Sequence, residues 1–241
     1  MIGAAASDAL DRIAALRRDL LHAYESGFEP LDSRIATPQA RSMRSLDPLS
    51  VVAPADSYFV SADAHAAPRY SRDGSFRLVD GTLRFADGSP ALGHSVSTPG
   101  SALGPLRVDP IDAALGRVSA AGIDSDGTFA YTRTSVDPRS GTQRTERIAV
   151  GRLALARLPA GTRPVAIDAT HVGIPPGTRP HLGVPGDGTF APLATHARDP
   201  GRLNFEAGLQ RLQEAYLSFE ALQSAYKTRE GVEKTTLDLL K

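Results

Sequence analysis

A few polar residues in this chain are of types that could catalyse a reaction or bind a metal ion. Gly93-His94-Ser95 begins like the turn that presents a nucleophilic serine, but the closing glycine is missing and no helical pattern follows. Asp124, Asp126 and Gly127 begin like a calcium-binding loop that lacks its closing glutamate. We therefore expect a strand or turn at both places. An enzyme remains only a residual reading, which would rest on Ser95.

The histidines and the absence of cysteine restrict the remaining chemistry. His22, His65, His94, His171, His181 and His196 show neither the His-x-His nor the i, i+4 spacing typical of metal ligands, so we expect solvated side chains. The chain has no cysteine, which excludes disulfides, thiol catalysis and cysteine-bound zinc. Gly183 to Gly188 lacks the lysine of a phosphate-binding loop. The sequence thus predicts no catalytic residue, no metal and no cofactor.

Length and composition limit the class of protein to which this chain can belong. The 241 residues suit one or two domains, and 27 basic residues balance 27 acidic ones, so no overall charge favours nucleic acid or an anionic membrane. No apolar run approaches the roughly 18–20 residues of a transmembrane helix. Asp8 and Asp11 interrupt any secretory signal at the N-terminus. We expect a soluble chain without a cleaved signal peptide or membrane insertion.

Three Asp-Gly pairs at a constant step of seven residues dominate the segment from Tyr70 to Gly93: Asp73-Gly74, Asp80-Gly81 and Asp87-Gly88. Asp-Gly favours the two-residue type I′ turn, in which both central residues have positive φ. Between the turns, Phe76 and Leu78 share one strand face, as do Leu83 and Phe85, while Arg77, Thr82 and Arg84 fall on the other. This pattern predicts an antiparallel meander with one solvated face.

The same segment resembles the signature of bacterial flagellar basal-body rod and hook proteins. The residues that carry the resemblance are Tyr70, Arg72, Gly74, Phe76, Gly81, Leu83, Gly88 and Gly93. Members of that family place a Gly-Phe pair just after their first helix, where this chain has Gly27-Phe28. Its first helix differs, with Arg18-Asp19 where the family usually carries asparagine and alanine. A leucine-rich end, Leu237 to Lys241, is also similar to that family.

Two long helices are predicted at the ends of the chain. Apolar residues recur every three or four positions from about Ala4 to Ser26, and in heptad phase from an N-cap at Asn204 to Lys241, with a break or local fraying expected near Gly231. The resemblance implies that the two helices pair as a coiled-coil-like stalk and make contacts between subunits. The expected assembly interface consists of Leu10, Ile13, Leu16, Leu20, Tyr24, Phe28, Leu209, Leu212, Tyr216, Phe219, Tyr226, Leu237 and Leu240.

The chain between the helices divides into an extended linker and a β domain. Residues 29–54 are polar and rich in proline, which predicts a linker. Ser57–Val60, Ile123–Arg133 and Ile148–Leu158 are strand candidates, and the Asp-Gly-[Ser/Thr]-[Phe/Leu] pattern occurs four times. We therefore predict an α+β fold. A helix over 1–28 and a linker over 29–54 precede a mostly antiparallel β domain over 55–200, and a second helix follows over 201–241.

The resemblance implies a structural, non-enzymatic subunit of the flagellar rod that contributes to motility by self-assembly. Its partners would be copies of itself, other rod or hook subunits and the flagellar export apparatus (type III), without nucleic acid. Its location would be the periplasmic span of the basal body, reached without a cleaved signal peptide. The alternative is a soluble binding or regulatory module, derived from the same family, that no longer polymerises.

Overall fold

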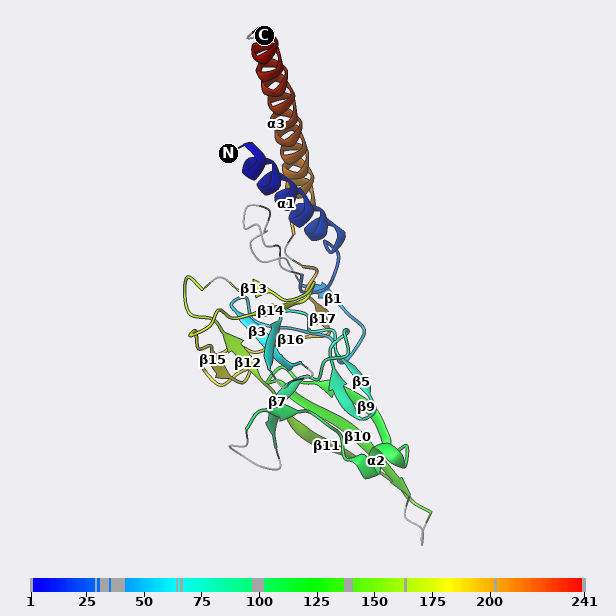
Figure 1. Cartoon of the computed structure of the whole chain (residues 1–241). Coiled ribbons are helices and arrows are strands. Elements are labelled where there is room, and N and C mark those ends of the chain that lie inside the picture. Colours follow the sequence, from blue (N-terminus) through cyan, green and yellow to red (C-terminus); the bar gives the residue numbers. More distant parts are fainter. Residues whose placement is uncertain are drawn as a thin grey trace. The chain divides into compact units, whose positions relative to one another are not determined.

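The computed structural model describes residues 2–28, 30, 35, 42–63, 65, 67–96, 102–136, 141–162, 164–201 and 203–239, excluding the side chains of 2–3 and 233–239 (Figure 1). Two compact units form. The helical unit comprises Met1–Tyr24, Pro30–Pro38 and Arg202–Lys241, and the β unit comprises Glu25–Glu29 and Gln39–Gly201. The predicted α+β class, with mostly antiparallel sheets and one helix at each end, is confirmed.

The helical unit contains α1 (Ile2–Leu21) and α3 (Phe205–Leu239), of 20 and 35 residues. At 1.5 Å per residue these helices are about 30 and 52 Å long. Asn204 caps α3 as predicted, because its Oδ1 accepts a hydrogen bond from the backbone N of Ala207 at 3.0 Å. α3 continues through Gly231, so the expected break there is wrong. The small core of the helical unit consists of Ile13, Leu16, Ile35 and Ala215.

The β unit contains two larger sheets. One has the strand order β13-β14-β4-β3-β12-β15 and the other β8-β7-β11-β10-β9, and every pair in both is antiparallel. The strands of the first are β3 (Ser57–Ala62), β4 (Pro68–Ser71), β12 (Leu155–Arg157), β13 (Val165–Ala166), β14 (His171–Gly173) and β15 (His181–Gly183). Those of the second are β7 (Leu92–Ser95), β8 (Gly104–Pro105), β9 (Val118–Ile123), β10 (Thr128–Val136) and β11 (Gln143–Leu153).

The predicted strand over Ile148–Leu158 is divided between these two sheets. β11 ends at Leu153 in one sheet and β12 begins at Leu155 in the other. Ala154 between them is fully buried, and its N donates to the carbonyl of Leu92 at 3.0 Å. The chain therefore passes from one sheet to the other without a surface loop, and the main core includes residues of both sheets, among them Phe59, Phe129, Leu153 and Leu155.

Three strand pairs and one short helix complete the β unit. The pairs are β1 (Met43–Arg44) with β17 (Ala197–Arg198), β2 (Val51–Val52) with β16 (Ala194–Thr195), and β5 (Arg77–Val79) with β6 (Thr82–Arg84); the helix is α2 (Pro110–Ala114). The linker prediction over 29–54 fails in its second half, because Leu49, Val51 and Ala53 lie in the main core. The strand in this segment, β2, has only two residues, which is too short to show an alternating pattern in the sequence. Within the described part of the chain, no helix is both long and apolar enough to cross a membrane.

The Asp-Gly pairs adopt three different geometries. Asp80 and Gly81 have φ values of 48° and 70° and join β5 to β6, which confirms the predicted type I′ hairpin. At Asp87-Gly88 only the glycine has positive φ. Gly74 is not in the positive-φ region, so the predicted turn at Asp73-Gly74 is wrong. A Cβ on Gly74 would lie 1.8 Å from the carbonyl oxygen of Val51. That glycine therefore permits close backbone packing.

Candidate functional site

Arg72 is buried near the place where the chain enters and leaves the β unit. It follows β4, and its Nη1 donates to the carbonyl oxygens of Ala55 and Ser57, both at 2.9 Å. Its Nη2 lies 3.4 Å from Oδ2 of Asp199. A guanidinium suits this position because its donors form a rigid planar fork. A single side chain thus connects the strand region at 55–57 with the segment just before α3.

Gly27, just after α1, lies against the same place. Its φ is +70°, and a Cβ there would lie 2.2 Å from the backbone N of Asp73. Its N donates to the carbonyl of Asp199 at 3.1 Å, which also accepts from Oγ of Ser26 at 3.1 Å. Only glycine combines that conformation with so close an approach. The glycine of the Gly-Phe pair is therefore required by backbone packing within this chain.

We call this assembly the clasp, which consists of Ser26–Phe28, Arg72–Ser75 and Asp199–Gly201. Asp73 is buried in it and accepts a hydrogen bond from the N of Ser75 at 2.9 Å. Burial raises the pKa of the Asp73 carboxyl, and hydrogen bonds from Ser75 and Ser26 oppose that rise. Asp199 Oδ1 accepts from the N of Gly201 at 3.0 Å. The segments that adjoin the two terminal helices thus meet on Arg72–Ser75.

The other residues behind the resemblance have packing or turn roles. Tyr70, Phe76 and Leu83 are buried. Gly81 and Gly88 have the positive φ values of turns, 70° and 89°. A Cβ on Gly93 would lie 2.2 Å from the carbonyl of Arg152, so this glycine lets β7 approach β11. Sequence reasoning selected these residues as a motif and missed Asp199, whose carboxylate contacts Arg72 and whose carbonyl accepts from Gly27.

The structure separates the expected interface residues into buried and exposed groups. Ile13 and Leu16 are buried in the helical unit, with Leu212 and Phe219 partly buried against them, and Leu20 is half-buried close to Gly208. Phe28 is buried in the β unit, so it is not accessible to another subunit in this conformation. Leu10, Tyr24, Leu209, Tyr216 and Tyr226 are exposed. Leu237 lies in α3 with its side chain undescribed, and Leu240 lies outside the described residues.

A groove on the helical unit collects some of the exposed apolar side chains. It has a volume of about 610 Å³ and is lined by Ala6, Leu10, Phe219, Leu222, Gln223, Tyr226 and Lys227. Contiguous apolar surface of this kind is typical of sites that contact another macromolecule. Tyr24, also exposed, packs against Phe205 in the same unit, with the two rings tilted and their centroids 5.7 Å apart.

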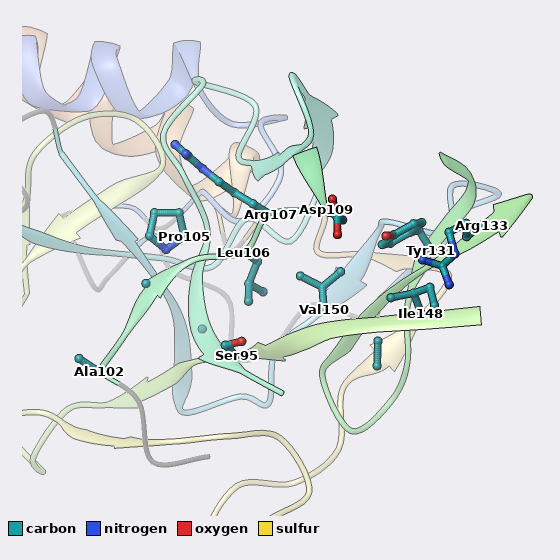
Figure 2. A pocket seen from close by; sticks show the side chains of 13 residues that line it. Ser95, Ala102, Pro105, Leu106, Arg107, Asp109, Tyr131, Arg133, Ile148 and Val150 are labelled. Carbon is teal, nitrogen blue, oxygen red and sulfur yellow. The ribbon is translucent and has the colours of Figure 1, made fainter. Parts of the chain in front are cut away.

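A second cavity, of about 450 Å³, lies in the β unit beside Ser95 (Figure 2). Tyr131 at its wall donates a 2.7 Å hydrogen bond to Asp112, and burial together with that carboxylate raises the pKa of Tyr131 to about 12. Arg133 pairs with Glu146 at 2.8 Å. The described lining residues include no histidine, lysine or cysteine.

The remaining polar candidates are arranged as follows. Asp124 pairs with Arg147 at 2.7 Å, and Asp126 accepts from the N of Thr128 at 3.0 Å, which confirms the predicted turn. His171 is fully buried, so the expectation of solvated histidines is wrong for it. Its surroundings come from three separate segments, which spacing along the chain could not reveal. In comparisons with known proteins, no family model and no curated protein matches this chain.

Proposed function

We propose that this chain is a structural subunit of the bacterial flagellar basal-body rod that assembles through its terminal helices and performs no catalysis. Its partners are copies of itself and other rod or hook subunits, and the flagellar export apparatus delivers it to the periplasmic span without a cleaved signal peptide. The observation that carries the proposal is the clasp. Residues that resemble the rod and hook signature hold the segments next to both terminal helices.

The clasp supports the proposal because residues of the rod and hook signature make long-range contacts in it. Arg72 and Asp73 contact the segments at Gly27 and Asp199. These two segments are distant in the chain, because the hydrogen bond between Ser26 and Asp199 joins residues 173 positions apart. A rod subunit must transmit force between its axial helices and its outer domain, so fixed chain crossings suit that role. A meander with only local turn chemistry would need neither the buried Arg72 nor a glycine at 27.

The exposed side chains of the helices supply the surface for assembly. Ile13, Leu16 and Ala215 form an in-chain contact, which we propose is the base of a coiled-coil-like stalk. Tyr216 and Tyr226 remain 41% and 54% exposed. In the proposed rod, neighbouring subunits cover these side chains. Their burial between subunits would provide the driving force for polymerisation.

Two sets of variants test this function. Tyr216→Asp with Tyr226→Asp changes exposed positions, so the stability of the isolated chain should change by no more than about 0.5 kcal/mol each. Incorporation into purified basal bodies, measured by immunoblot, and motility should both be lost. Leu16→Ala removes a buried in-chain contact and should lower stability by about 2–5 kcal/mol.

The control is Leu46→Asp, at a position in the β unit that is 93% exposed and should tolerate the charge with assembly intact. Normal incorporation of the Tyr216→Asp, Tyr226→Asp protein, at wild-type cellular levels, would remove the exposed face of α3 from the assembly mechanism. Loss of folding in that variant would likewise contradict the account, because both side chains would then be needed within the chain.

The second candidate is a soluble binding or regulatory module derived from the same family. The observation in its favour is Asp19, which is buried in α1 and lies 2.7 Å from the guanidinium of Arg18. A charged pair packed in the helical unit suits a helix pair that is complete in the monomer. Gene neighbourhood and light scattering separate the two. Rod and export genes nearby favour the subunit, whereas a monodisperse chain that ignores axial proteins favours the module.

A further inference from the structure

Three possible metal-ligand side chains converge in the β unit around His171. His171 begins β14, Asp168 lies in the loop before it, and Asp87 comes from the Asp-Gly turn after β6. One ligand atom from each lies within 4.8 Å of the other two. Asp87 is 84 residues and Asp168 three residues away from His171 along the chain. The fold therefore brings together donors that sequence spacing separates.

The two ring nitrogens of His171 have different polar neighbours. Nε2 lies 3.4 Å from Oγ of Ser89. Ser89 donates its own hydroxyl hydrogen to Oδ1 of Asp87 at 2.8 Å. Its oxygen can then accept from the ring, so the tautomer with the hydrogen on Nε2 donates to Ser89 and leaves the lone pair of Nδ1 for a metal ion. In the other tautomer, Nδ1 donates to Oδ1 of Asp168 at 3.1 Å.

Nδ1 faces two carboxylates. Nδ1 lies 3.1 Å from Oδ1 of Asp168 and 3.6 Å from Oδ2 of Asp87, and the ring is only 1% exposed. The hydroxyl of Thr170, at 3.2 Å, is the neutral group close enough to donate to it. A divalent metal ion that replaces the Nδ1 hydrogen would attract this nitrogen and both carboxylates, whose side chains are 35% and 39% exposed for Asp87 and Asp168.

The Asp87 carboxylate differs from its counterpart in another Asp-Gly turn. Asp126 uses both oxygens on Thr128, with bonds of 3.0 and 2.9 Å. Asp87 instead directs both turn bonds from Ser89 to Oδ1, at 2.9 and 2.8 Å, and turns Oδ2 toward His171. Formation of the turn therefore leaves one oxygen of Asp87 available as a ligand.

One arginine, Arg69, lies beside this cluster and is shared between two carboxylates. Arg69 lies 3.7 Å from Asp168, and the same guanidinium lies 3.7 Å from Asp63. The three carboxylates of Asp63, Asp87 and Asp168 thus outnumber the one Arg69 guanidinium, so the cluster can accept a cation.

We propose that Asp87, Asp168 and His171 form a binding site for a divalent transition metal of the zinc type. An imidazole nitrogen with two carboxylates suits zinc better than calcium or magnesium, which prefer oxygen ligands alone. Tetrahedral zinc with bonds of about 2.0–2.1 Å places its ligands about 3.3 Å apart, close to the 3.1 and 3.6 Å separations at Nδ1. The ion fixes the Asp87 turn to the loop before β14. This site is independent of the assembly function.

The test uses the tag-free full-length chain, treated with EDTA and titrated with zinc chloride by calorimetry. One zinc ion should bind per chain at concentrations below about 100 µM. The Asp87→Asn protein should bind at least about tenfold more weakly. Asp126→Asn, which makes the equivalent change in a turn without a histidine, should bind as the wild type does. Asparagine retains an acceptor for the Ser89 amide, so the Asp87 variant keeps its turn.

A ¹⁵N spectrum of the imidazoles provides the second measurement, in which zinc should shift the His171 Nδ1 resonance more than those of the other histidines. Absence of zinc binding up to about 1 mM by the folded protein would overturn the proposal. Equal affinity of the Asp87→Asn and wild-type proteins would also overturn it, because other histidines would then hold the ion.

Discussion

Replacement of Gly27 by alanine should destabilise the β unit much more than the same replacement in an unconstrained turn. Gly27 has a φ of +70°, and its added Cβ would lie 2.2 Å from the N of Asp73 and 2.5 Å from the carbonyl carbon of Arg72. Gly88 has a φ of +89° with no atom within 4 Å of an added Cβ. Gly88→Ala is therefore the matched control, because it introduces the backbone strain alone.

The expected difference follows from these contacts. The left-handed conformation costs a non-glycine residue about 1–2 kcal/mol at either position. At Gly27 the backbone must also move by about 1 Å to relieve the overlap. That movement breaks the 3.1 Å bonds from Gly27 N and Ser26 Oγ to the Asp199 carbonyl, at about 1 kcal/mol or more each. Gly27→Ala should thus be less stable than Gly88→Ala by about 2–4 kcal/mol.

Urea denaturation of the full chain measures this difference. Near-ultraviolet circular dichroism reports on the buried tyrosines Tyr70 and Tyr131 of the β unit. With a slope of about 2 kcal/mol/M, the midpoint for Gly27→Ala should lie about 1–2 M below that for Gly88→Ala. Midpoints within about 0.3 M of each other would refute the reasoning, since the segment at Gly27 would then not be held against Asp73.

Three further predictions concern the clasp and its neighbouring turn. Arg72→Met should reduce the free energy of unfolding by about 3–5 kcal/mol, because Asp199 loses its partner in a buried place; a loss below about 1 kcal/mol by urea denaturation would contradict this. Burial raises the folded pKa of Asp73 above its ordinary value of 3.8, so its contribution to stability is present below about pH 4 and is lost as the pH rises through the folded pKa. The urea midpoint of Asp73→Asn relative to wild type should therefore rise between pH 3 and 7, whereas a constant difference would contradict the raised pKa. Gly81→Val should cost about 1–3 kcal/mol in thermal denaturation, because the type I′ turn requires positive φ there, and an unchanged midpoint would show that the turn does not need it.

Local chemistry explains the parts of the fold that the sequence could predict. The hairpin at Asp80-Gly81 depends on two adjacent residues, and the cap of α3 depends on Asn204 and a residue three positions later. The strand at Ser57–Val60 and the two terminal helices have enough apolar residues for their periodicity to be visible. These features arise within short windows of sequence.

The features that could not be predicted depend on residues distant in the chain. Asp73-Gly74 has the composition of a turn, but the backbone of Val51 passes beside Gly74 and decides its conformation. Val51 belongs to the core although its strand has only two residues. His171 is buried because Phe85 packs edge-on against its ring, at 5.5 Å between centroids. Tertiary packing, and not propensity, determines each of these positions.

The most direct test of the central claim is the amount of this chain in highly purified basal bodies. Quantitative mass spectrometry of preparations from flagellated cells that express the chain should compare the wild-type chain with the Tyr216→Asp, Tyr226→Asp variant, relative to a known rod protein. The account predicts several copies of the wild-type chain per basal body and near-complete loss of the variant, at equal cellular levels of both. Absence of the wild-type chain from intact basal bodies, in cells that express it, would contradict the claim.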